Sequence, residues 1–155
     1  MPASRPTARI EQHTLHRAHR GLDGLLAQLE TMTRLCDALP AAELDAAFDR
    51  LLREIDRTLG RHVQWEEQVC FPDTERAPGA DWATRLLRLQ HAQIAAAIET
   101  LAADRRQVAA EPGRPAGPGR RDGVGRHLHV LHALLTSHLE QEERAILELL
   151  LELPD

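Results

Sequence analysis

Two histidines in this sequence are each followed, four residues later, by a glutamate: His62 by Glu66, and His138 by Glu142. Residues four apart in an α-helix lie on one face, a turn from each other. Imidazole and carboxylate groups both bind metal ions, so each pair could contribute to a metal site. A single pair is a weak signal, because a sequence with nine histidines and many acids gives about one match by chance.

The apolar residues around the two pairs indicate that both pairs face a helical core. Positions three, seven and ten before each histidine are leucine or isoleucine, and the seventh position after it is valine or alanine. This spacing predicts one buried helical stripe for each pair. The two stripes are Leu52, Ile55, Leu59, His62, Glu66 and Val69, and Leu128, Leu131, Leu135, His138, Glu142 and Ala145.

Two further histidines share a different set of apolar neighbours. Each has leucine four residues before it, and leucine or isoleucine three, seven and ten residues after it. Their stripes are Leu15, His19, Leu22, Leu26 and Leu29, and Leu87, His91, Ile94, Ile98 and Leu101. The chain is therefore predicted to contain two similar helix pairs, each with one histidine helix and one histidine–glutamate helix.

Carboxylates inside a helical core need a compensating charge. Burying one costs several kcal/mol unless it is paired or metal-bound, and two would repel each other in a low dielectric. Cations remove both penalties, and imidazole suits iron, zinc or copper. We therefore predict a two-metal site with His19, His62, His91 and His138 as terminal ligands, and with Glu66 and Glu142 as bridging ligands. No thiolate is expected at this level, which argues against a zinc or copper(I) site.

Proline and glycine divide the chain into the elements that must position these residues. Helices are predicted over residues 7–39, 42–71, 81–107 and 124–153, with Asp81 as the N-cap of the third. Residues 111–123 are rich in proline and glycine, which predicts a flexible, exposed loop. No stretch shows the alternation of a strand. The expected fold is all-α: one domain over residues 1–155, an up-down-up-down antiparallel four-helix bundle.

Composition narrows the class of protein. Hydrophobic residues make up 43% and charged residues 28% of the chain, as in a globular domain, and the net charge is −5. This charge gives no reason to expect nucleic acid or a membrane surface as partner, and no apolar run is long enough to span a bilayer. The N-terminus lacks the apolar core of a secretory signal, so a cytoplasmic location is expected. Cys36 and Cys70 are expected to be free thiols.

The four histidine segments, HRGL, HVQWEEQVCFP, LQHAQI and HLEQEER, resemble the hemerythrin-like (HHE cation-binding) domain over nearly the whole chain. The resemblance implies a four-helix bundle around a non-haem di-iron centre: two iron ions bridged by carboxylates and an oxo or hydroxo group. Oxygen-carrying members have one further histidine, a turn before the position of His91. Leu87 stands there, and Ala95, a turn after His91, cannot replace it. One iron is then short of a protein ligand, which argues against reversible oxygen carriage.

Two functions are compatible with such a site. The first is a hemerythrin-like protein that binds or reacts with a small ligand (O2, NO or peroxide) or senses or handles iron. The second is a metal-stabilised helical interaction module without turnover. The sequence leaves open whether the protein is an enzyme. Its lack of tyrosine excludes a tyrosyl radical or a tyrosinate ligand.

Some neighbouring residues keep more than one interpretation. His16 could supply the ligand missing at Leu87 or could replace His19, and is otherwise partly exposed. Asp23, a turn after His19, is expected to support a ligand or to lie at the surface. Cys70, a turn after Glu66, is expected to pack as a small hydrophobe rather than to act in redox chemistry.

Other polar residues near the motifs are expected at the surface. Glu67 and Glu143 follow the two motif glutamates and point about 100° away from them. A hydrogen bond to a ligating histidine is the alternative role for both. The histidines at the start of the last helix are expected to face solvent, and the two tryptophans to pack in the core or at its rim. These residues are His127, His129, His132, Trp65 and Trp82.

Overall fold

The computed structural model describes residues 12–114 and 121–152. Within these residues all regular structure is helical, which confirms the predicted fold class. The elements are α1 (Gln12–Arg20), α2 (Asp23–Leu35), α3 (Ala41–Ile55), η1 (Asp56–Gly60), α4 (Arg61–Trp65), η2 (Glu66–Cys70), α5 (Phe71–Thr74), α6 (Asp81–Ala110), η3 (Arg121–Gly125) and α7 (Arg126–Glu152). The three η elements are π-helical turns.

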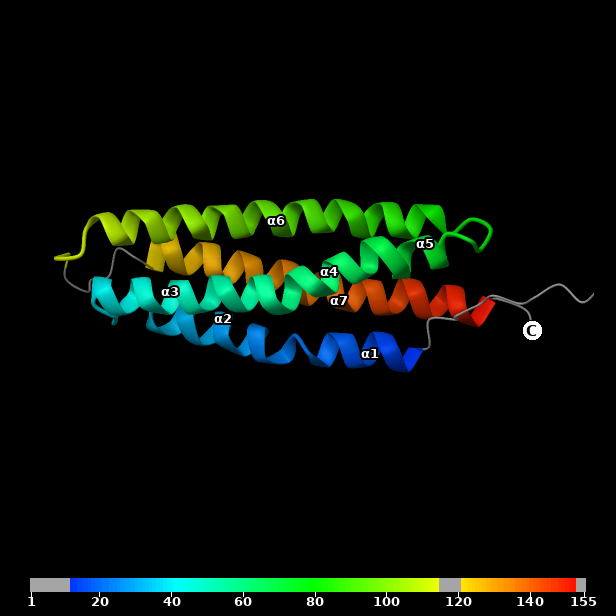
Figure 1. The fold of residues 1–155 in the computed structure, drawn as a ribbon, viewed down its shortest axis with the longest axis horizontal. Helices are drawn as coiled ribbons and strands as arrows, with labels where there is room; N and C mark the ends of the chain where they lie inside the picture. The colour runs from blue at the N-terminus through cyan, green and yellow to red at the C-terminus, as the bar shows by residue number, and fades with distance from the viewer. Residues whose placement is uncertain (1–11, 115–120, 153–155) are drawn as a thin grey trace, which may run out of the picture.

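The helices form four rods that lie lengthwise beside one another (Figure 1). The first rod is α1 followed by α2, and the second runs from α3 to α5 through η1 and η2. Helices α6 and α7 are the third and fourth rods, and the colour shows that each rod runs back along the previous one. Helix α2 packs against α3 and α7, and α6 packs against the same two helices. Every rod can therefore place side chains in a shared centre.

A long leucine-rich core fills most of the bundle. It contains completely buried residues from every rod, such as Leu29, Phe48, Leu101 and Leu131. A smaller apolar cluster lies toward the other end and contains Leu15, Cys70, Phe71, Leu87 and Ile146. The predicted stripes contribute to both clusters, with Leu29 and Leu101 in the larger one and Leu15 and Leu87 in the smaller. Leu26, Leu52 and Ile98 of the stripes are only partly buried.

The first predicted helix is interrupted directly after its histidine. Helix α1 ends at Arg20, and α2 starts at Asp23. Between them the Gly21 amide lies 3.1 Å from the carbonyl oxygen of Ala18, and the Leu22 amide 2.8 Å from that of His19. These contacts three residues back tighten the turn, and glycine is a poor helix former. The predicted start at residue 7 lies outside the described residues.

The second rod departs from a uniform α-helix at η1 and η2. Because a π-helical turn takes more residues than an α-helical one, the buried stripe shifts by one position. Val69 was predicted to be buried but is 50% exposed, and Cys70 is buried instead. The rod also continues past Pro72, the predicted stop, to Thr74. Proline is tolerated there because it lies in the first turn of α5.

Boundaries of the other two rods also differ from the prediction. Asp81 is the first residue of α6, and Ala80 precedes it without a side-chain cap, so the predicted cap is wrong. Helix α6 continues to Ala110. Of the predicted 111–123 loop, residues 115–120 lie outside the described residues, and residues 121–123 belong to η3. None of the described helices is long and apolar enough to cross a membrane.

Candidate metal centre

All six predicted ligands lie in one buried polar layer. The exposed fraction is 8% or less for each of the four histidines and 0% for both glutamates, Glu66 and Glu142. Leu22, Leu59, Ile94 and Leu135 lie one turn from the histidines on one side of this layer, and all four are buried. Leu15, Cys70, Leu87 and Ile146 lie one turn from the ligands on the other side and are also buried. The polar layer is therefore enclosed along the bundle by apolar layers.

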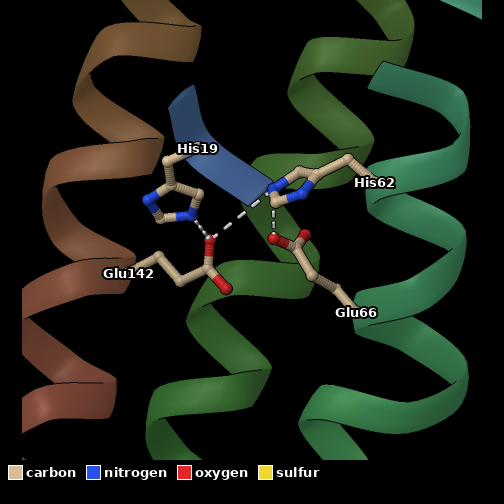
Figure 2. Close-up of side chains that lie close together, drawn as sticks. All are labelled: His19, His62, Glu66 and Glu142. Carbon is tan, nitrogen blue, oxygen red and sulfur yellow. Dashed lines mark hydrogen bonds and ion pairs between the residues drawn. The ribbon is translucent and has the colours of Figure 1, made fainter. Parts of the chain in front are cut away.

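The structure brings the six side chains together in two groups. His19, His62, Glu66 and Glu142 form the first group, whose nearest ligand atoms all lie within 4.8 Å of one another. Figure 2 shows these four side chains pointing toward one another. Glu66, His91 and His138 form the second group under the same limit. Glu66 belongs to both groups, so it lies between them.

The distances show how Glu66 divides its two oxygens. Oε1 contacts Nε2 of His62, and Oε2 lies 2.8 Å from Nε2 of His91. Glu142 uses Oε2, which lies 3.0 Å from Nε2 of His19. Nε2 of His138 lies 3.8 Å from one oxygen of each glutamate. Every one of these contacts involves Nε2, so the four rings present the same nitrogen to the centre.

Several of these atoms lack the hydrogen bonds that burial normally requires. Within the described part of the chain, no hydrogen-bond partner is found for Nε2 of His62, His91 and His138, for both oxygens of Glu66, or for Oε1 of Glu142. Buried polar groups are almost always hydrogen-bonded, and leaving one unpaired costs about 1–3 kcal/mol. Converging lone pairs of nitrogen and oxygen are what a cation needs. The donor set therefore fits a metal ion of the imidazole- and carboxylate-binding class.

The two glutamates differ in their electrostatic surroundings. Burial opposes ionisation of Glu66, but the imidazoles of His138, His62 and His91 outweigh it and hold the pKa of this carboxyl far below its usual range. Burial raises the pKa of Glu142, against the hydrogen bond from His19, and the charge of Glu66 adds to the rise. Without a cation, Glu66 is therefore stabilised as a carboxylate, whereas Glu142 ionises only at a higher pH than an ordinary glutamate.

Three of the four histidines also have a partner at Nδ1. Glu67 Oε1 lies 2.7 Å from Nδ1 of His91, and Glu143 Oε1 lies 2.8 Å from Nδ1 of His19. The side-chain oxygen of Gln90 lies 2.9 Å from Nδ1 of His138. Nδ1 of His62 has no hydrogen-bond partner among the described residues. For Glu67 and Glu143 the structure shows the alternative role, a hydrogen bond to a histidine of the centre.

A comparison with protein families agrees with this geometry. The family model described as the Hemerythrin HHE cation binding domain matches residues 11–150. The chain belongs to this family. A search of curated proteins and a search of solved structures gave no significant match. In this hemerythrin-family chain, the histidines and glutamates of the buried layer are therefore the candidate cation ligands.

His16 lies beside this layer, outside both groups. Its Nδ1 lies 3.2 Å from Glu143 Oε1, the same oxygen that contacts Nδ1 of His19. Asp23 is exposed, and it borders a cavity of about 280 Å³ together with His16 and His19. A second cavity, of about 290 Å³, is bordered by His62. Surface cavities thus approach the first group from two sides.

The other histidines and the two tryptophans differ in their exposure to solvent. His129 is exposed as predicted, and His132 is partly buried. His127 is not simply solvated, because its Nδ1 lies 2.8 Å from Oδ2 of Asp104, which is 8% exposed. Trp65 packs partly buried against the smaller apolar cluster, whereas Trp82 is 60% exposed and does not pack in the core.

The two cysteines lie in the interior of the bundle. Neither Cys36 nor Cys70 forms a disulfide, as predicted, and both are buried, which was expected for Cys70. Burial raises the pKa of the Cys70 thiol, and the charges of Glu142 and Glu66 add to the rise, so this residue packs as a neutral hydrophobe.

Proposed function

We propose that this chain is a hemerythrin-like protein that holds two iron ions and binds or reacts with a small ligand such as O2, NO or a peroxide. His19 and His62 would hold one ion and His91 and His138 the other. Glu66 would bridge the two ions, and Glu142, which lies in the first group only, would bind the first ion. The observation that carries the proposal is the pair of ligand groups that share Glu66. A carboxylate that two ligand groups share suits a pair of neighbouring ions better than a single ion.

The proposal includes the chain's organisation. The whole of residues 1–155 would form one up-down-up-down antiparallel domain, and the reversal of direction between successive rods supports this topology (Figure 1). A cytoplasmic location is part of the proposal, supported by two cysteines that do not form a disulfide. These reversals of direction would bring histidines that are distant in sequence to one level.

The chain's own residues would supply binding, orientation and exclusion of water. When bound, reduced iron offers electrons and an open coordination position to a small ligand. The second group has three candidate ligands, against four in the first, so it leaves more room for that ligand. Leu87, 1% exposed, fills the position one turn before His91 with an apolar side chain. A small uncharged molecule suits such a position, because an apolar wall cannot pair with a charge.

Metal analysis of protein produced in iron-rich medium would test the proposal. We expect about two iron ions per chain, near-ultraviolet absorption, and rapid spectral changes when the reduced protein is mixed with O2, NO or peroxide. Tight binding of metal without any response to these ligands would favour the metal-stabilised helical module instead. Protein that retains no iron or other transition metal would contradict both functions.

A further inference from the structure

Each histidine–glutamate pair is followed directly by a second glutamate, Glu67 after Glu66 and Glu143 after Glu142. Both second glutamates reach a histidine of another rod. Glu67, on the second rod, contacts His91 of the third, and Glu143, on the fourth, contacts His19 of the first. The two contacts are equivalent in the internal repeat of the chain.

We propose that Glu67 and Glu143 are positioning residues of the metal centre, and that each fixes the ring orientation and the tautomer of one ligating histidine. This inference rests on the proposed function, because it assumes that His91 and His19 bind metal. Neither glutamate would touch an ion. Each would act through the imidazole between itself and the centre.

The two nitrogens of each imidazole ring have different roles. A neutral imidazole carries one N–H, so a carboxylate that accepts the hydrogen bond from Nδ1 leaves Nε2 with a free lone pair. In His91, Nδ1 lies 2.7 Å from Glu67 and Nε2 lies 2.8 Å from Glu66. In His19, Nδ1 lies 2.8 Å from Glu143 and Nε2 lies 3.0 Å from Glu142. In both rings the second glutamate therefore turns Nε2 toward the centre.

Other side chains hold Glu67 in place. Nε of Arg88 donates to Glu67 Oε2 over 2.9 Å, and the same guanidinium lies 5.2 Å from the ring centre of Phe71. Phe71 in turn stacks on His91, with ring centres 5.4 Å apart and planes inclined by 20°. Arg88 also contacts Glu75. His91 is thus fixed at Nδ1 and on one ring face by residues that are themselves connected.

Glu143 has a looser arrangement. The same oxygen that contacts His19 also lies 3.2 Å from Nδ1 of His16, whose side chain is 36% exposed. One oxygen of Glu143 is therefore shared between two histidines, whereas Glu67 contacts His91 and Arg88 with separate oxygens. We therefore expect a weaker effect on metal binding from Glu143 than from Glu67.

Both glutamates can be replaced without opening the core. Their side chains are 35% and 34% exposed, in contrast to Glu66 and Glu142, which are completely buried. Variants Glu67→Ala, Glu67→Gln, Glu143→Ala and Glu143→Gln should keep the helical fold, which far-ultraviolet circular dichroism checks. Glu140→Ala is a matched control, because Glu140 is exposed on the same helix as Glu143 and lies outside both ligand groups.

The first readout is Co²⁺ affinity, measured by competition with a chelator. We expect the alanine variants to bind about 10–100-fold more weakly than the wild-type chain. The glutamine variants should lose less, because an amide oxygen still accepts the bond from Nδ1. The Glu140→Ala control should bind like the wild type. Effects of a general loss of packing would instead lower the melting temperature of the metal-free protein.

The second readout separates orientation from stability. In the Co²⁺ protein, each ligating imidazole gives a shifted N–H proton signal that exchanges with water. Glu67→Ala should shift or broaden the signal of His91 only, and Glu143→Ala that of His19 only. Variants that bind as tightly as the wild type with unchanged signals would overturn this inference alone. A wild-type chain that binds neither Co²⁺ nor iron would overturn the proposed function as well.

Discussion

The two halves of the chain supply the same set of ligands from rods of different construction. The first half, from α1 to α5, is interrupted at Gly21 and again at η1 and η2. The second half consists of α6 and α7, helices of 30 and 27 residues that run without interruption past the centre. Each half provides one lone histidine and one histidine–glutamate pair. A repeat in sequence therefore need not be a repeat in backbone geometry.

The consequence is clearest in the two motif glutamates. Glu66 is the first residue of η2 and contacts histidines of both ligand groups. Glu142 lies within the regular helix α7 and belongs to the first group only. π-Helical turns are frequent at functional sites because they move a side chain off the regular helical face. The irregular rod thus carries the more central of the two carboxylates.

The largest expected effect comes from removing these carboxylates one at a time. Glu66→Ala should abolish the binding of both ions, because each group loses a ligand and the link between them. Glu142→Ala should leave the group of Glu66, His91 and His138 complete and able to retain one ion. Elemental analysis after dialysis measures the number of ions per chain. Equal losses in the two variants would contradict the comparison between the halves.

The metal-free protein offers a second test of the same pair. Because burial raises the pKa of Glu142, Glu142→Gln should increase the free energy of unfolding of the metal-free chain, by about 1–3 kcal/mol. Glu66→Gln should give no gain, since three imidazoles stabilise the Glu66 carboxylate. Urea unfolding of chelator-treated protein measures both values.

The pH dependence of the stability gained by Glu142→Gln provides a control for this test. A carboxyl whose pKa is raised on folding stabilises the protein at low pH, and this stabilisation is lost as the pH rises through the folded pKa. The advantage of Glu142→Gln over the wild type should therefore grow from the acidic to the alkaline side of neutral. An advantage that shrinks with rising pH would show that Glu142 is not buried in the way described.

A matched pair of histidine substitutions tests which group lacks a ligand. Leu87→His places an imidazole one turn before His91, beside the group with three candidate ligands. Leu15→His does the same before His19, beside the group that already has four. Leu87→His should raise metal affinity by about 10-fold, because metal binding by the new imidazole offsets the free-energy cost of burying it. Leu15→His should only destabilise the metal-free protein, by about 1–3 kcal/mol. Co²⁺ titration and urea unfolding measure the two effects.

Much of the centre could be predicted because its signal is periodic. His62, Glu66, His138 and Glu142 share their spacing with buried leucines, and burial of charge at such positions needs an explanation beyond packing. The structure brings these residues together, but their role as ligands stays a prediction. The predicted burial of Val69 was wrong because the prediction assumed a uniform α-helical period, which η1 and η2 break.

Contacts between the rods were harder to predict than which face of each rod is buried. Gln90 gave no sequence signal, since it lies about 100° from His91 on α6 and contacts His138 of α7 instead. Asp104 and His127 likewise pair across two helices. Such partners depend on how rods are rotated against each other, and one sequence carries little information on that rotation. The interruption after His19 was missed for a different reason, since one glycine within a helical pattern is usually tolerated.

The smallest expected effects concern the two glycines of the interrupted half, which lie two residues from a ligand: Gly21 after His19, and Gly60 before His62. Gly60 has helical angles (φ −58°, ψ −43°), and an added Cβ would lie 3.6 Å from Asp56 Oδ1, an ordinary contact. Gly60→Ala should therefore increase the free energy of unfolding by about 0.5–1 kcal/mol.

Gly21→Ala should fail to give the same gain, and it is the matched control for Gly60→Ala. A Cβ at Gly21 would lie 3.1 Å from the carbonyl oxygen of Ala18, and this atom belongs to the backbone that holds the tight turn. Relief of the contact requires the turn to open, which would move His19 at the end of α1. We expect Gly21→Ala to be neutral or destabilising by up to about 1 kcal/mol in urea unfolding, and to weaken Co²⁺ binding slightly. If both glycines gave equal gains with unchanged affinity, the break after His19 would have no part in positioning the first ligand group.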